Sequence, residues 1–171
     1  MAVYTKLSEN DLNNFFSKYS LGKLLNYEEI KEGIENTNYF VHLEKGKFIL
    51  TVYEKRVEEK DLPFFVGLMK NLFNKSFPSP EPIINKNGNY ISEILKKKAA
   101  VVSFLDGVSK KNLTANDCFE VGLNSAKLHS ITKNLTGKRV NKLSVDSWGK
   151  IYNKVKNDCS KIDQNLPRII E

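Results

Sequence analysis

A glycine followed by small polar side chains lies within the stretch EGIENTNYFVHLEKGKFILTVYEKR, residues 32–56. Gly33 allows a backbone bend that other residues adopt only at a cost, and Asn36, Thr37 and Asn38 carry polar groups that could line a phosphate site. The chemistry would be the holding of phosphate by backbone N–H groups and polar side chains. The further glycines of a common phosphate loop are absent, so by pattern alone an ordinary hairpin entry explains the stretch better.

The elements around this loop are predicted from local periodicity. Ser8 and Asp11 have the spacing of a capping box, and an apolar stripe with helical spacing follows them. A strand is expected at 24–34, and alternating apolar residues predict strands at 39–43 and 48–53. These three strands would form an antiparallel meander in which the loop is the first bend.

The next segment continues the same lobe. Asp61 is a suitable N-cap for a helix with Pro63 in its first turn, and the proline-rich FPSPEP ends that helix. The Asn87-Gly88 pair predicts a hairpin between 82–85 and 90–94, and the continuously apolar run from residue 99 predicts a buried strand to residue 105.

The periodicity becomes helical after Asp106-Gly107. Thr114 and Asp117 form a second capping box, and a last amphipathic helix is expected over 148–162. The sequence therefore predicts an α+β protein with a sheet-containing lobe at 1–105, and a hinge with helices at 106–171.

Composition limits the classes of function. The net charge is +7, and the whole excess lies beyond residue 90, but nearly all of it is scattered lysine, which does not favour a nucleic-acid site. Cys118 and Cys159 are far apart and form neither a zinc motif nor a disulfide framework, which fits a reducing cytoplasm. No signal pattern and no apolar run of membrane-spanning length is present.

Several segments together carry a family resemblance. GIENTNYFV, FILTVYEKR, DLPFF, AAVVSFLDGVS, DCFEVGLNSAKLHSIT and LSVDSW closely resemble homoserine kinases of the aminoglycoside phosphotransferase and choline kinase group. The likeness extends through nearly the whole chain. It implies a protein-kinase-like fold with an antiparallel-sheet N-lobe, and ATP-dependent phosphorylation of the L-homoserine hydroxyl to O-phospho-L-homoserine, a step in threonine biosynthesis that uses Mg²⁺.

The resemblance also assigns binding roles. The residues from Gly33 to Asn38 would cover the nucleotide, while the carbonyl of Ser103 and the N–H of Leu105 would contact the adenine edge. Kinases place a phosphate-binding lysine where this chain has Thr51.

Lys55 lies on the same face of the strand as Thr51 and is the nearest basic alternative; Arg56, on the opposite face, is a poorer one. A carboxylate partner for Lys55 could be Glu59, with Glu58 as the alternative. Both basic groups could equally be solvated charges at a strand end.

The catalytic part of the family pattern is missing. No His-x-Asp followed by an asparagine occurs, and no later magnesium-binding aspartate is placed as in the family. We therefore expect no catalytic residue and no metal ligand in this chain, which would be the N-terminal part of the enzyme and inactive alone.

Three origins fit that expectation: a truncated reading frame, a fragment, or half of a split enzyme whose other lobe is a separate chain. The competing hypothesis is a non-catalytic module that uses its basic helical half to bind nucleic acid or protein.

Overall fold

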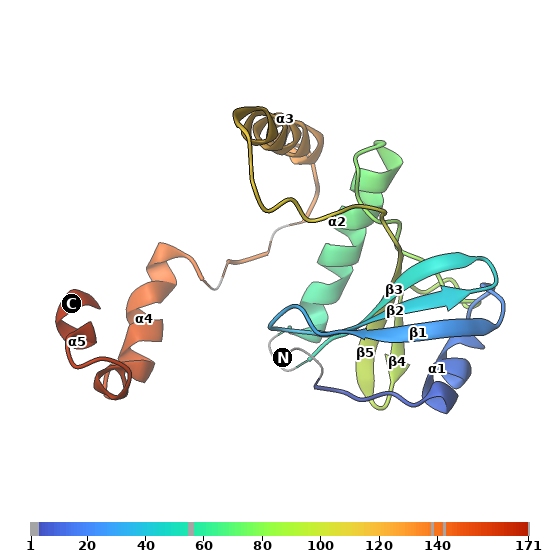
Figure 1. The fold of residues 1–171 in the computed structure, drawn as a ribbon, viewed down its shortest axis with the longest axis horizontal. Coiled ribbons are helices and arrows are strands. Elements are labelled where there is room, and N and C mark those ends of the chain that lie inside the picture. The colour runs from blue at the N-terminus through green and yellow to red at the C-terminus, as the bar shows by residue number, and fades with distance from the viewer. Residues whose placement is uncertain (1–3, 55–56, 138, 142, 171) are drawn as a thin grey trace. The chain divides into compact units, whose positions relative to one another are not determined.

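The computed structural model describes residues 4–54, 57–137, 139–141 and 143–170. The chain divides into two compact units, residues 1–137 and 138–171 (Figure 1). The first unit includes the long helix that follows residue 105. None of the helices in the described ranges is long and apolar enough to cross a membrane.

A five-stranded antiparallel sheet is the centre of the first unit, with the strand order β1-β2-β3-β5-β4 (Figure 1). The predicted meander is confirmed, although its first strand ends earlier than expected. The strands are β1 (Leu24–Ile30), β2 (Thr37–Leu43), β3 (Gly46–Val52), β4 (Ile91–Ile94) and β5 (Lys97–Ser103).

Helix α1 (Glu9–Phe16) covers one face of this sheet. It begins as predicted: the Ser8 side chain accepts a hydrogen bond from the Asp11 N–H, and the Asp11 carboxylate accepts one from the Ser8 N–H. The apolar side of α1 packs against alternate residues of the strands, such as Tyr39 and Leu50, which are completely buried. This core fixes which face of each strand is internal.

The predicted hairpin around Asn87-Gly88 is wrong. Strand β4 pairs with β5, and the earlier segment also reaches β5, through a bridge between Pro82 and Val102. The turn that joins β4 to β5 is Leu95-Lys96, with φ of 46° and 63°. Two residues with positive φ suit the right-handed twist of a hairpin, and the sheet imposes this conformation on residues that do not favour it.

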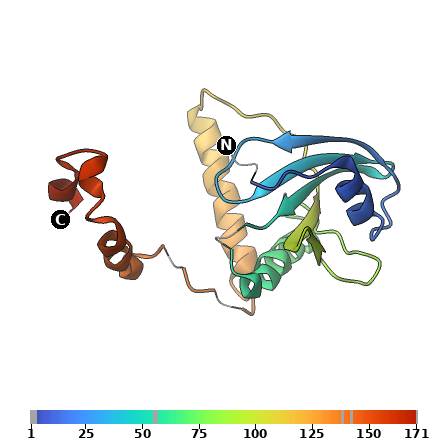
Figure 2. The same ribbon diagram turned by 90° about the horizontal axis from the view of Figure 1, so that it is seen from below.

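Helix α2 (Leu62–Asn74) follows a short 3₁₀ turn, η1 (Glu59–Asp61). It starts after Asp61 as predicted, although the Asp61 side chain makes no capping hydrogen bond. Helix α3 (Ala115–Thr132) begins with the predicted capping box of Thr114 and Asp117, and it packs against α2 (Figure 2).

The second unit contains α4 (Val145–Val155), a 3₁₀ turn η2 (Cys159–Lys161) and α5 (Leu166–Ile170). The single helix predicted over 148–162 is therefore wrong in its second half. The segment beyond α4 is rich in Asn, Asp and Ser, whose side chains favour turns over the helix interior.

Candidate nucleotide-covering site

The face of the sheet opposite α1 is only half-buried around the middle strands. Asn38 and Phe40 of β2 alternate with the buried residues and lie beside Thr51 and Ile49 of β3. The Thr51 hydroxyl donates a hydrogen bond to Asn38 Oδ1 at 2.8 Å. The middle of this face is therefore apolar, with the polar pair at the end beside the loop between β1 and β2, and with His42 opposite Lys47 toward the other end.

The end of β5 closes one side of this face. The ring of Phe40 meets Phe104 edge to face, with centroids 5.2 Å apart. Ser103 is held by the Glu81 backbone: its N–H donates to the Glu81 carbonyl at 2.8 Å, and its Oγ accepts from the Glu81 N–H at 2.8 Å. Leu105 follows in an irregular, exposed segment. Ser103 and Leu105 thus lie at the edge of the half-buried face, where the sequence had placed adenine contacts.

The loop between β1 and β2 lies at the other end of the face. Gly33 has φ of 112°, in the region that favours glycine. The Asn36 Oδ1 accepts a hydrogen bond from the Glu54 N–H at 3.4 Å, which ties the loop to the end of β3. Gly33 and Asn36 thus both lie in the bend between β1 and β2 that the sequence predicts.

Thr37 occupies a different position from its neighbours. Its side chain is fully buried and shares a face with Tyr39, on the α1 side of the sheet. The strict alternation of apolar residues in β2 was a sequence signal for this placement, because Thr37 is in phase with the core residues. Asn38 lies on the half-buried face, so the structure brings Asn36 and Asn38, but not the Thr37 side chain, to surfaces that a ligand could contact.

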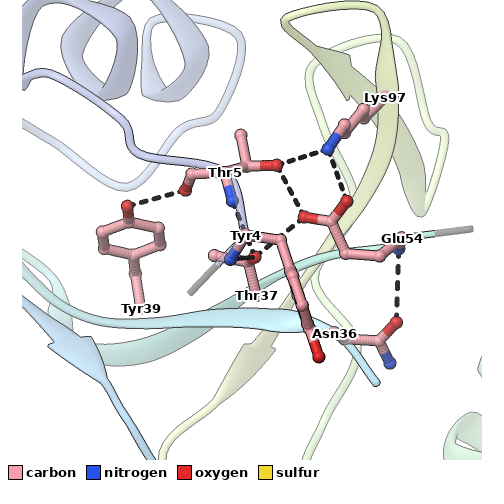
Figure 3. Close-up of polar contacts among 7 residues, drawn as sticks. All are labelled: Tyr4, Thr5, Asn36, Thr37, Tyr39, Glu54 and Lys97. Atoms are coloured by element: carbon pink, nitrogen blue, oxygen red, sulfur yellow. Dashed lines mark hydrogen bonds and ion pairs between the residues drawn. The ribbon is translucent and has the colours of Figure 1, made fainter. Parts of the chain in front are cut away.

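A polar cluster surrounds the Thr37 hydroxyl (Figure 3). This hydroxyl donates to Glu54 Oε1 at 2.8 Å, and the Thr5 hydroxyl donates to the same oxygen at 2.6 Å. Lys97, the first residue of β5, binds the other carboxylate oxygen of Glu54 and also donates to Thr5 Oγ1 at 2.6 Å. The cluster joins four segments that are distant in sequence.

Glu54 is held as a carboxylate by this cluster. Burial would raise the pKa of Glu54, but the hydrogen bonds from Lys97, Thr5 and Thr37 outweigh it, so the pKa lies below the ordinary value. The sequence analysis missed both Glu54 and Lys97. Their pairing depends on the register of β3 with β5, which no local pattern reveals.

Beside this cluster lies a pocket of about 280 Å³. Its lining combines charged groups from the end of β3, the start of α2 and the β4–β5 turn: Tyr53, Glu54, Val57, Glu59, Leu62, Lys96, Lys97 and Lys98. Burial raises the pKa of the Tyr53 hydroxyl. The pocket adjoins the segment in which Lys55 and Arg56 occur, and both of these residues lie outside the described residues.

The carboxylates considered as partners of Lys55 have lysine neighbours of their own. Glu59 Oε2 is 3.7 Å from the Nζ of Lys98, and Glu58 Oε2 is 2.8 Å from the Nζ of Lys60. The hydrogen bond from Lys98 to Glu93, together with the charges of Glu59 and Glu93, raises the pKa of Lys98. Lys98 thus links β5 to the turn before α2, an ion pair that the sequence analysis did not anticipate.

The described part of the chain does not fit a magnesium ion. Within it, no three His, Cys, Asp or Glu side chains come together as ligands. The positive groups near the pocket are lysines, which bind anions and not cations. We therefore derive no chemical step through a metal from these residues.

Comparisons with known proteins place these observations in a family context. The chain matches the family model described as phosphotransferase enzyme family over residues 26–155. Homoserine kinases of Beijerinckia indica and Agrobacterium fabrum are 43% and 41% identical to it, over 99% and 97% of this chain but only 53% and 52% of their own lengths. The chain thus spans about half the length of the curated relatives it matches.

A solved structure is similar in fold. The crystal structure of spectinomycin phosphotransferase in complex with ADP and spectinomycin superimposes with a TM-score of 0.61 over 91% of this chain and 48% of that protein. The sequence identity is 13%, so the likeness concerns the fold alone. It confirms the predicted protein-kinase-like fold, with the antiparallel sheet and helices described above.

Proposed function

Because this chain belongs to the phosphotransferase enzyme family, we propose that it forms the nucleotide-covering part of a homoserine kinase. The reaction transfers the terminal phosphoryl group of ATP to the hydroxyl of L-homoserine, a cytoplasmic step of threonine biosynthesis. The observation that carries the proposal is the identity of about 40% to homoserine kinases along almost the entire chain.

The half-buried face of the sheet is the proposed adenine site. Its apolar side chains, such as Phe40 and Ile49, would pack on the base, and the Ser103 carbonyl and Leu105 N–H would bind its polar edge. Backbone recognition of this kind requires a fixed strand end, and the two hydrogen bonds between Ser103 and Glu81 support it.

The segment from Gly33 to Asn38, which comprises the end of the loop and the first residues of β2, is the proposed cover of the phosphates. Thr51 carries no positive charge, so Lys55 is the proposed cation for phosphate, next to Glu54 in sequence. Phosphoryl transfer depends mainly on positioning and on charge stabilisation, and this chain would supply part of both.

The proposed activity needs more than these 171 residues. No His-x-Asp followed by an asparagine occurs in the sequence to orient the homoserine hydroxyl. We expect the purified chain to show no phosphorylation of L-homoserine in a coupled assay that measures ADP release. ADP release that depends on L-homoserine would contradict this expectation.

Nucleotide binding by the chain itself can be measured by calorimetry. We expect ATP and adenosine to bind, and Lys55→Met to weaken ATP binding by about tenfold while adenosine binding is unchanged, because only ATP carries phosphate. Lys98→Met is the matched control, since it removes a nearby lysine that already neutralises Glu59 and Glu93. Equal loss of ATP affinity in both variants would contradict the role of Lys55.

A chimera tests the activity. The half of the Agrobacterium fabrum kinase that this chain does not match is fused after the matching region, and phosphorylation of L-homoserine, L-serine and L-threonine is compared. We expect preference for L-homoserine. A folded chimera that binds ATP but phosphorylates none of the three would refute the proposed reaction.

A further inference from the structure

The N-terminal segment, residues 4–7, begins beside the loop between β1 and β2 and runs along the buried face of the sheet toward α1. In Figure 1 this segment runs from beside that loop to α1. We propose that it is a positioning strap for the nucleotide-covering loop, with Tyr4, Thr5 and Thr37 as positioning residues. This inference rests on the proposed function, because it concerns how the same site is held ready for nucleotide.

The Thr37 hydroxyl is the centre of the strap. It accepts hydrogen bonds from two successive backbone groups, the N–H of Tyr4 at 2.9 Å and the N–H of Thr5 at 3.1 Å, and donates to Glu54 (Figure 3). A hydroxyl has one proton to donate and two lone pairs that accept, so the three hydrogen bonds use the full hydrogen-bonding capacity of the Thr37 hydroxyl. Thr37 begins β2 immediately after the loop, and this group therefore fixes the place where the loop ends.

A second contact reaches the loop itself. The Tyr4 hydroxyl donates to the carbonyl of Ile34 at 2.7 Å, one residue after Gly33. Ile34 is otherwise exposed, with 73% of its surface accessible. An exposed loop next to a glycine has many accessible conformations, and the tyrosine restricts them from the outer side.

The strap is itself anchored to the core. The Tyr39 hydroxyl donates to the Thr5 carbonyl at 2.9 Å and accepts from the Leu7 N–H at 2.9 Å. Both Tyr39 and Thr37 are completely buried. The end of the loop is thus bound to the core through two successive residues, Thr37 and Asn36, both of which contact Glu54.

This arrangement has a consequence for nucleotide binding. A loop that must order itself around phosphate loses conformational entropy on binding, and this loss reduces affinity. A loop already held by the strap avoids most of that loss. The side chains of Thr5 and Thr37 are buried in the polar cluster on the α1 side of the sheet, so they would act through the loop and not by touching the nucleotide.

The experiment measures hydrogen exchange of the loop amides, residues 31–36, without nucleotide, and ATP affinity by calorimetry. Thr37→Val removes the hydroxyl at nearly constant volume, and Tyr4→Phe removes only the bond to Ile34. We expect exchange in the loop to become about tenfold faster in Thr37→Val and ATP binding to weaken several-fold, because the three hydrogen bonds of the Thr37 hydroxyl are lost. Tyr4→Phe is expected to show a smaller change in the same direction.

Two further variants distinguish positioning from loss of stability. Thr37→Ser keeps the hydroxyl and is expected to retain slow loop exchange and the ATP affinity of the unchanged protein. Tyr19→Phe removes another buried hydroxyl contact, to Ser92 Oγ at 2.9 Å in β4, and is expected to leave loop exchange unchanged.

The proposed strap would be overturned if loop exchange in Thr37→Val is as slow as in the unchanged protein. It would also be overturned if Tyr19→Phe accelerates loop exchange as much as Thr37→Val does. Both results count whether or not ATP binds. Failure of the unchanged chain to bind ATP would instead count against the proposed function. Loop exchange that accelerates with no change in ATP affinity would overturn the positioning role.

Discussion

Replacing Lys97 by methionine should destabilise the first unit far more than replacing its neighbour Lys98. The Lys97→Met change removes the cation that binds the Glu54 carboxylate, whose side chain is 9% exposed. Breaking a fully buried ion pair costs about 3–5 kcal/mol. Here Lys97 is 38% exposed and Glu54 keeps two hydroxyl donors, so we expect a loss of about 2 kcal/mol in the free energy of unfolding.

The effect should depend on pH with a definite sign. The folded-state pKa of Glu54 lies below the ordinary value of 4.5, so the carboxylate contributes stability that is fully present above 4.5 and is lost as the pH falls through the folded-state pKa. The difference between the unchanged protein and Lys97→Met should therefore be largest near neutral pH and should shrink below about pH 4.5.

Urea unfolding followed by far-ultraviolet circular dichroism is the appropriate assay. Trp148, the single tryptophan, lies in the second unit, and its fluorescence would not report on the sheet. Lys98→Met is the matched control: its partners Glu93 and Glu59 are 54% and 73% exposed, so the loss of Lys98 should destabilise the protein much less than the loss of Lys97. Equal destabilisation by the two changes, or a Lys97→Met effect that grows in acid, would refute the reasoning.

Two further changes test local structure by thermal unfolding. Lys96→Gly should stabilise the protein by roughly 0.5–1 kcal/mol, because glycine adopts the φ of 63° at the β4–β5 turn without strain. The control, Lys98→Gly within β5, should destabilise the protein. A lower melting temperature for Lys96→Gly would contradict the assigned turn. Ser8→Ala should lower the free energy of unfolding by about 1 kcal/mol, because it removes the cap of α1. The control, Ser17→Ala at the other end of that helix, should lower it much less. Equal losses in the two variants would contradict the capping box.

Part of the candidate site could be predicted because its signals are local. The bend at Gly33 needs only a glycine between two strands, and the capping boxes of Ser8 and Thr114 are fixed by three-residue spacings. The face on which Thr37 lies could also be predicted from the sequence, because Thr37 is two residues before Tyr39 and therefore alternates in step with the apolar residues of β2. The phosphate role predicted for its side chain rested on residue type, as a small polar group after a glycine, and did not take that phase into account.

Other features could not be predicted from local signals. Asn87-Gly88 is a strong turn signal, yet its two flanking segments both pair with β5, and the actual hairpin turn uses Leu95 and Lys96, which carry no such signal. The Asn87-Gly88 turn does form, with the Gly88 N–H donating to the Asn85 carbonyl at 2.9 Å, but the segments on either side of it follow the register of β5, because several ladder hydrogen bonds and a buried face depend on that register.

The sequence by itself determined most of the helices and strands, the apolar faces that build the core, and the resemblance to a phosphotransferase family, because each of these is carried by periodicity or by contiguous segments. Only the tertiary structure decided that Glu54 meets Lys97, 43 residues away, and that residues 4 and 5 meet Thr37 beside the loop. Such contacts depend on strand register and on the path of the chain over a face, which are properties of the assembled sheet and of no single segment.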